Sequence, residues 1–287
     1  MNNPAWIAQL AVWLLFYVLL LVGHHFWEQW LGGRFHQRPA GRVAPRLSRR
    51  DWPVIVVALL AGAVIPLAPA NLSAPQSSSW RLPGDSSAAL LYALALQWAG
   101  EAILIARAEF PLKKQGEARW NAHHSTLETH LVNAIPMLLI VLSLLLAVKP
   151  GSLRLTAWLE AQRKWNGLGW FAWRQPVAFL LWLICARPPA WTAQTQAGWS
   201  GQALTLNRAL LTSALFMGGG GGPFVDRVPW LAVLYTTLQV GLIALVWTLA
   251  RSALPPAVSN KHVQTVFKIA IPLSALNLIV TALIATR

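Results

Sequence analysis

Long apolar stretches alternate with short polar segments along the whole chain. Eight of these stretches are long enough to cross a bilayer as tilted α-helices. They run over Trp6–Phe26, Pro53–Pro69, Ala88–Ala106, Leu131–Val148, Trp170–Ala186, Leu204–Gly218, Trp230–Leu249 and Phe267–Thr286. The pattern predicts an all-α polytopic transmembrane bundle of about eight spans, which forms one integral membrane domain over residues 1–287.

Three polar segments between these stretches are informative. Residues 107–130 mix Lys, Arg, Glu and His and predict a polar cytoplasmic loop with a short surface helix. Residues 186–203 predict a second, shorter cytoplasmic loop. Residues 149–169 predict an outer loop that is unusually basic.

Composition narrows the class of protein further. The chain is 56% hydrophobic and only 11% charged, with a mean hydropathy of +0.48. A soluble domain carries about 25% charged residues, so an ordinary soluble enzyme is excluded. A single cysteine, Cys185, excludes a disulfide framework, a thiolate-bound iron–sulfur cluster and a structural zinc site of the usual ligand count.

The positive charge fits a membrane topology better than a nucleic-acid partner. The net charge is +14, from 23 Lys and Arg against nine Asp and Glu. An orientation with both termini outside places thirteen of these basic residues in inner loops and seven in outer segments. Basic residues favour cytoplasmic loops, so we expect the N-terminus and C-terminus outside and no nucleic acid bound.

Glu101 is the candidate site residue that stands out, because it lies within the third apolar stretch. Its carboxylate is either a buried group bonded to a neighbouring helix or a proton-relay site, and the sequence leaves both open. Glu28 ends the first stretch and could form an interfacial ion pair. The adjacent histidines His24-His25 and His123-His124 point to different helix faces, so we expect no metal site. Glycine-rich nucleotide-binding motifs are absent, so this chain itself should hold no redox cofactor.

Two motifs carry a resemblance to a known family. Arg251-Ser-Ala-Leu-Pro255 is followed by Lys268-Ile-Ala-Ile-Pro272-Leu-Ser-Ala-Leu-Asn277. Near the start, a basic loop of that family is matched, with one residue deleted, by Glu28, Gly33, Arg34, Arg38, Arg42, Val43 and Pro45. Together these motifs resemble the H subunit of bacterial NADH–quinone oxidoreductase, which is subunit 1 of mitochondrial complex I.

The resemblance implies a membrane subunit in the bacterial inner membrane, at the junction with the peripheral electron-transfer arm. Quinone would be the substrate, and flavin and iron–sulfur clusters would be held by partner subunits. Those partners would include peripheral iron–sulfur subunits and antiporter-like membrane subunits, with lipids around the bundle. The resemblance implies Glu28, Arg34 and Arg38 at a quinone chamber, Glu101 as a catalytic proton site, and Arg251 and Lys268 on a charged axis.

Departures from the family pattern leave alternatives open. The family carries a run of acids after its fifth span, whereas residues 186–201 here contain none. The family's fourth-span glutamate is also lost, because the corresponding residues are Val132-Asn133-Ala134-Ile135-Pro136. Alanine and glutamine cannot bind and release a proton at working pH. The resemblance therefore leaves three alternatives open: a subunit that contributes to quinone reduction and ion translocation, a non-catalytic membrane anchor with a degenerate quinone site, or the equivalent subunit of a membrane-bound hydrogenase-type complex.

Overall fold

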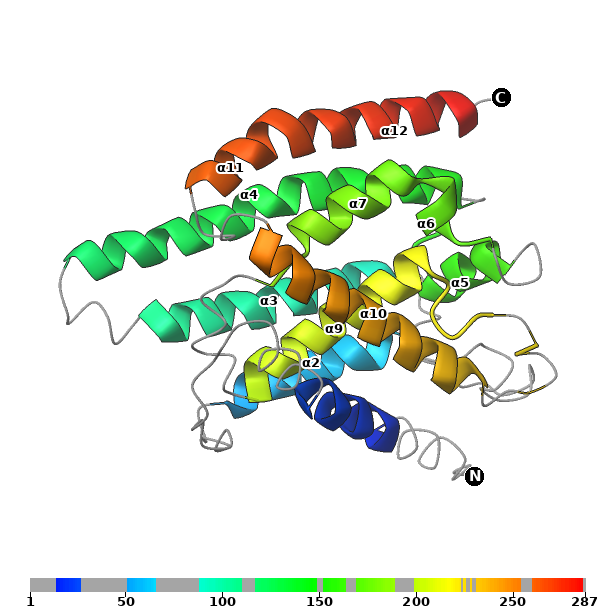
Figure 1. Ribbon diagram of the computed structural model, residues 1–287, viewed down its shortest axis with the longest axis horizontal. Helices are drawn as coiled ribbons and strands as arrows, with labels where there is room; N and C mark the ends of the chain where they lie inside the picture. The colour runs from blue at the N-terminus through cyan, green and yellow to red at the C-terminus, as the bar shows by residue number, and fades with distance from the viewer. Residues whose placement is uncertain are drawn as a thin grey trace.

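The computed structural model is helical in every element that it describes (Figure 1). It describes residues 14–26, 51–65, 88–109, 117–148, 152–163, 169–188, 199–222, 224–225, 228, 231–253 and 260–285, and of residues 106–109, 117–127, 251–253 and 260 the backbone alone. The elements are a first helix over Leu14–Phe26, α2 (Trp52–Val64), α3 (Ala89–Glu109), α4 (Glu117–Ala147), α5 (Leu155–Arg163), α6 (Phe171–Arg174), α7 (Pro176–Cys185), α9 (Trp199–Phe216), α10 (Leu231–Ala253), α11 (Asn260–Thr265), a π-helical turn η3 (Val266–Ala270) and α12 (Ile271–Ala285).

Each of the eight apolar stretches overlaps at least one of these helices. Three helical segments in the described part are both long and apolar enough to cross a membrane: Glu128–Ala147, Leu231–Ala250 and Lys261–Ala285. Four further apolar helices are shorter: Leu14–Phe26, Trp52–Val64, Ala89–Ile105 and Pro176–Cys185. The all-helical fold is thereby confirmed for the described residues, while the number of spans and the orientation stay predictions.

Helix α9 is the centre of the molecule. Every side chain from Ser200 to Phe216 is buried, because α2, α3, α5, α7 and α10 all pack around it (Figure 1). A helix that is surrounded by protein must satisfy its polar side chains internally. Asn207 does so by donating to the carbonyl of Ala58 at 2.6 Å and accepting from the Tyr17 hydroxyl at 2.8 Å.

Close approach between these helices depends on glycine. A Cβ on Gly62 of α2 would lie 2.7 Å from Cε2 of Tyr17 and 3.0 Å from Oδ1 of Asn207. Real Cβ atoms do not tolerate such distances, so the absent side chain lets the first helix and α9 meet α2 here.

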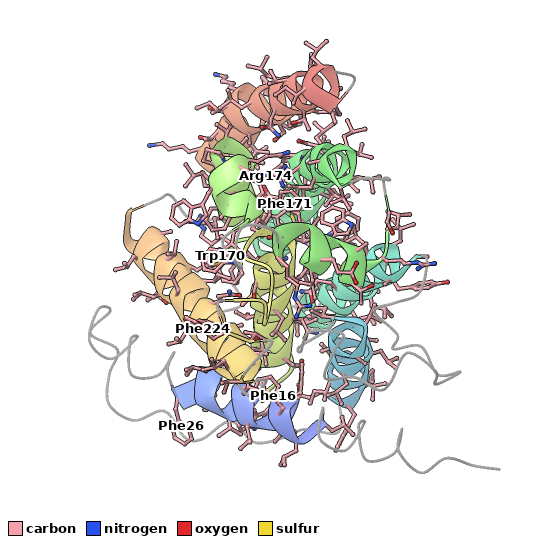
Figure 2. All side chains as sticks on the ribbon, turned by 90° about the vertical axis from the view of Figure 1, so that its right-hand side faces the viewer. Phe16, Phe26, Trp170, Phe171, Arg174 and Phe224 are labelled. Atoms are coloured by element: carbon pink, nitrogen blue, oxygen red, sulfur yellow. The ribbon has the colours of Figure 1, made fainter. Side chains whose placement is uncertain are left out.

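A second group of helices, α4, α7 and α12, packs beside this central group. Helix α12 runs parallel to α4, because His262 bonds Asn133 at 3.1 Å and Asn277 bonds Ser143 at 2.6 Å. Gln175 separates α6 from α7, and its side chain accepts a hydrogen bond from Ser143 at 3.0 Å. At the same end, the Arg174 guanidinium lies 5.4 Å from the centre of the Phe171 ring (Figure 2).

Two local expectations differ from the structure. The segment predicted as an outer loop contains α5, whose Gln162 amide donates to the carbonyls of Ala214 and Leu215 at the end of α9. This helix is nine residues long, too short to be counted among the stretches that cross a bilayer, although Leu155, Trp158 and Leu159 line its buried face. The segment predicted as a polar loop over 107–130 is helical at both ends, since α3 continues to Glu109 and α4 begins at Glu117.

Candidate functional site

Glu101 lies on α3 in the interior of the molecule, where its side chain is 9% exposed. Gln97, one turn earlier on the same helix, donates to Oε1 of Glu101 through its amide. That amide also donates to the carbonyl of Leu204 on α9 at 3.1 Å. Gln97 therefore links the Glu101 carboxylate to the backbone of α9, in addition to the charged partners described next.

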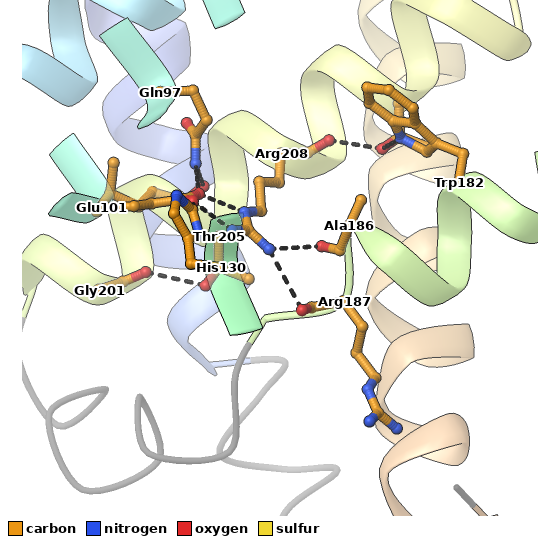
Figure 3. A network of polar contacts seen from close by, with 11 residues as sticks. Gln97, Glu101, His130, Trp182, Ala186, Arg187, Gly201, Thr205 and Arg208 are labelled. Carbon is orange, nitrogen blue, oxygen red and sulfur yellow. Dashed lines mark hydrogen bonds and ion pairs between the residues drawn. The ribbon is translucent and has the colours of Figure 1, made fainter. Parts of the chain in front are cut away.

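Arg208 on α9 is the charged partner of Glu101. Its Nε donates to Oε1 and its Nη2 donates to Oε2, so guanidinium and carboxylate meet in the two-pronged geometry (Figure 3). Both side chains are almost fully buried. Removal of one member of such a buried pair leaves an uncompensated charge, at a cost of about 3–5 kcal/mol.

The third nitrogen of Arg208 reaches another helix. Its Nη1 donates to the carbonyl of Ala186 at 2.8 Å and to that of Arg187 at 3.3 Å, where α7 ends (Figure 3). The last carbonyls of a helix lack partners within the helix and carry partial negative charge, so a guanidinium caps them well. Arg208 thus joins α3, α7 and α9.

His130 on α4 completes the cluster. Its Nδ1 lies 3.3 Å from Oε2 of Glu101, the oxygen to which Nη2 of Arg208 also donates (Figure 3). His130 is less buried than Glu101, and it is the third residue of the apolar segment Glu128–Ala147. We name Gln97, Glu101, His130 and Arg208 the Glu101 cluster. It brings a carboxylate, an imidazole and a guanidinium together where α3, α4, α7 and α9 converge.

A groove of about 460 Å³ lies elsewhere, between the first helix and α10. It is lined by Leu19, Leu20, Gly23, His24, Thr237, Leu238, Val240, Gly241, Leu242 and Leu245. A Cβ on Gly23 or Gly241 would meet no atom within 4 Å, so these two glycines leave the groove open. Its walls are apolar except for His24 and Thr237.

Comparison with known proteins gives a partial match. No family model matches the chain. Two curated proteins are 39% identical over 83 residues, and both are form 2 of the NADH-quinone oxidoreductase H subunit, from Cereibacter sphaeroides strains ATCC 17029 and ATCC 17023. The match covers 29% of this chain and 24% of each relative, so it spans about a quarter of the relatives' own length. Part of the chain is similar to this H subunit.

The apolar helices and this similarity together indicate a membrane protein, part of which is similar to a subunit of an oxidoreductase complex. Of the residues that the resemblance singled out, Glu101 lies at the centre of a buried cluster. Lys268 lies on η3 and is exposed. Glu28, Arg34 and Arg38 lie outside the described residues, as does the side chain of Arg251. The quinone chamber and the charged axis stay predictions.

Sequence reasoning did not assign Arg208 and His130 to this site. A signal for Arg208 was present, because an arginine within an apolar stretch needs a counter-charge and Glu101 is the acidic residue that lies within another such stretch. His130 carried no comparable signal. In the described part of the chain, no group of three or more His, Cys, Asp or Glu is placed to hold a metal ion.

Proposed function

We propose that this chain is a membrane subunit of a complex I-like NADH–quinone oxidoreductase, at the junction with the peripheral electron-transfer arm. It would cross the bacterial inner membrane about eight times with both termini outside, contribute to the quinone site and take part in proton translocation. Flavin and iron–sulfur clusters would belong to partner subunits, and quinone would be the substrate. The partial similarity to the H subunit and the eight apolar stretches support this assignment.

The buried Glu101 cluster is the observation that carries the proposal. Ionisable groups inside a membrane are rare and mark proton relays or ion pathways, because their transfer from water costs several kcal/mol. Glu101 and His130 are in contact at 3.3 Å, and a carboxylate and an imidazole at this distance can exchange a proton directly. His130 stands nearer the polar end of α4, so protons would pass between that side and Glu101 through its ring.

The groove between the first helix and α10 supports a quinone site. A quinone has an apolar isoprenoid tail and two carbonyl oxygens that accept hydrogen bonds. Ligand sites of this kind are mostly apolar with a few placed polar groups, which is how the groove is lined. His24 would donate to a quinone carbonyl. The predicted chamber residue Glu28 is four residues further along the sequence.

A second function, a non-catalytic membrane anchor, is favoured by one feature of the same cluster. All three nitrogens of Arg208 are engaged with Glu101 and the end of α7, as expected of a static structural ion pair. In that case the cluster would hold four helices together and no proton would move.

The experiment starts from the whole assembly in native membranes, purified through a tag on this chain. We expect iron–sulfur and antiporter-like subunits to co-purify, and NADH to reduce quinone with proton uptake. Glu101→Gln keeps the size of the side chain and one oxygen that can accept from Arg208, but it removes the charge and the proton site. The uncompensated Arg208 charge should lower stability, so assembly is measured alongside translocation. We expect the variant to assemble and to lose at least tenfold in proton translocation per quinone reduced. Full translocation with normal assembly would favour the anchor, and purification without redox subunits would refute the enzyme assignment.

A further inference from the structure

The last helical segment, α11 to α12, lies along one edge of the molecule (Figure 1). Its contacts with the rest of the chain are made mainly with α4 and α7, and only 17% of the most apolar window in Lys261–Ala285 is buried. The outward side is apolar along most of its length. Its exposed large side chains are Phe267, Ile269, Leu273, Leu276, Ile279, Val280, Leu283 and Ile284.

Five of these residues form a regular stripe. Ile269, Leu273, Leu276, Val280 and Leu283 are spaced by four, three, four and three residues. This repeat of 3.5 is the spacing by which one helix packs its side chains between those of another helix. A neighbouring helix could therefore pack its side chains along this stripe.

Lys268 is exposed between the side chains of Phe267 and Ile269, and Lys261 at the beginning of the same segment is exposed as well. Lys268 follows Lys261, the first residue of the apolar span, by seven residues. At 1.5 Å per residue that is about 10 Å along the helix axis. The 25-residue span is about 37 Å long against a hydrocarbon thickness of about 30 Å, so the Cα of Lys268 lies about 7 Å inside the apolar layer. At that depth the ammonium group must either extend along the helix toward the membrane surface or meet a counter-charge within the apolar layer.

In the described part of this chain, no carboxylate is recorded at the position of Lys268 along the helix axis. The ion pairs recorded there both use Glu101, which Arg208 occupies. Glu128 on α4 is five residues before Asn133, and Asn133 bonds His262. Because α4 and α12 run parallel, Glu128 lies beyond the beginning of α11 and far from Lys268.

The backbone is also unusual at Lys268. The residue lies in the π-helical turn η3, three residues before Ile271 begins α12. Pro272 follows and has no N–H with which to bond the carbonyl of Lys268. Single π turns within α-helices are frequently found at functional sites. The irregular turn and the charge coincide at one point of the exposed side.

We propose that the exposed side of η3 and α12 is an interface for a transmembrane helix of a partner protein, and that this helix places a carboxylate against Lys268. The partner is expected to belong to the proposed oxidoreductase assembly, so the inference rests on the proposed function for the identity of the partner. The charge and the stripe on this chain carry it independently.

The test uses the full assembly in native membranes. A photo-crosslinking amino acid replaces Leu276 at the centre of the stripe, and mass spectrometry identifies the product. Lys268→Glu reverses the charge, Lys268→Arg retains it, and Lys261→Glu is the matched control two turns earlier at the membrane edge. We expect a crosslink to a transmembrane helix that carries Asp or Glu. We further expect at least tenfold less of that partner with Lys268→Glu, and no loss with Lys268→Arg or Lys261→Glu.

Restoration by the reciprocal carboxylate→Lys change in the partner would establish the pair. A crosslink to lipid alone, or equal assembly with Lys268→Glu and wild type, would overturn the interface and assign Lys268 to lipid phosphates. Redox subunits that still co-purify in that case leave the proposed function standing. A crosslinked partner from an assembly without redox cofactors has the opposite meaning, because the interface then stands and the oxidoreductase assignment falls.

Discussion

Arg208 and Glu101 share one buried ion pair, and its parts can be tested separately. Arg208→Ala removes the counter-charge and the cap on α7 together, so we expect a loss of about 3–5 kcal/mol of unfolding free energy. The double variant Glu101→Leu, Arg208→Met replaces both charges by apolar groups and should lose far less. Reversible unfolding in mixed micelles measures both. A loss below about 1 kcal/mol for Arg208→Ala would contradict the burial of the pair.

The same residues show what a sequence can and cannot supply. Glu101 is identifiable because a carboxylate in an apolar stretch is conspicuous wherever it folds. Its partner lies 107 residues later, and pairing over that separation depends on how α3 meets α9. His130 was not predicted for another reason. It is the last residue of the polar segment 107–130, where a histidine is not unusual. Local pattern finds the isolated charge, and tertiary packing decides which groups surround it.

At the scale of elements, the contact between α2 and the first helix should be intolerant of any side chain at Gly62. A methyl group there meets the Tyr17 ring and Asn207, and both are held by hydrogen bonds. We expect Gly62→Ala to cost about 1–3 kcal/mol of unfolding free energy. Gly241→Ala on α10 is the control, since its new methyl group meets no atom within 4 Å. It should gain about 0.5–1 kcal/mol from helix propensity. Equal effects at the two positions would argue against the close approach.

The groove between the first helix and α10 allows a test of quinone binding at the scale of elements. Gly241→Leu fills open space between α10 and the first helix, so it should raise the KM for quinone several-fold and leave kcat nearly unchanged. Leu234→Phe, on the exposed side of α10 and outside the groove, serves as the control. Steady-state quinone reduction by the purified assembly measures both. If the two variants have the same KM as the wild type, quinone does not occupy this groove.

Hydropathy predicted the presence of a helix more reliably than it predicted the residues at which the helix begins and ends. The apolar stretch predicted from Leu204 belongs to a helix that begins five residues earlier, at Trp199. The extra turn includes Gln202, whose polarity ends the hydropathic signal although the residue is buried. Helix α5 was not predicted for a different reason, because its nine residues are too few to cross a bilayer although Leu155, Trp158 and Leu159 form a buried apolar face.

At the scale of the whole molecule, a labelling experiment can test whether the chain crosses the membrane an even or an odd number of times, without knowledge of the function. Eight spans put both ends of the chain on one side of the membrane, whereas crossing by only the three segments that are both long and apolar enough would put them on opposite sides. The thirteen basic residues of the expected inner loops favour both ends outside.

Single cysteines at Ser73 and Gly116, in a Cys185→Ser background, sample an expected outer and an expected inner segment. We expect a membrane-impermeant maleimide to label Ser73→Cys in intact cells, and Gly116→Cys only after permeabilisation. The reverse labelling would invert the topology, and labelling of both in intact cells would rule out the eight-span arrangement.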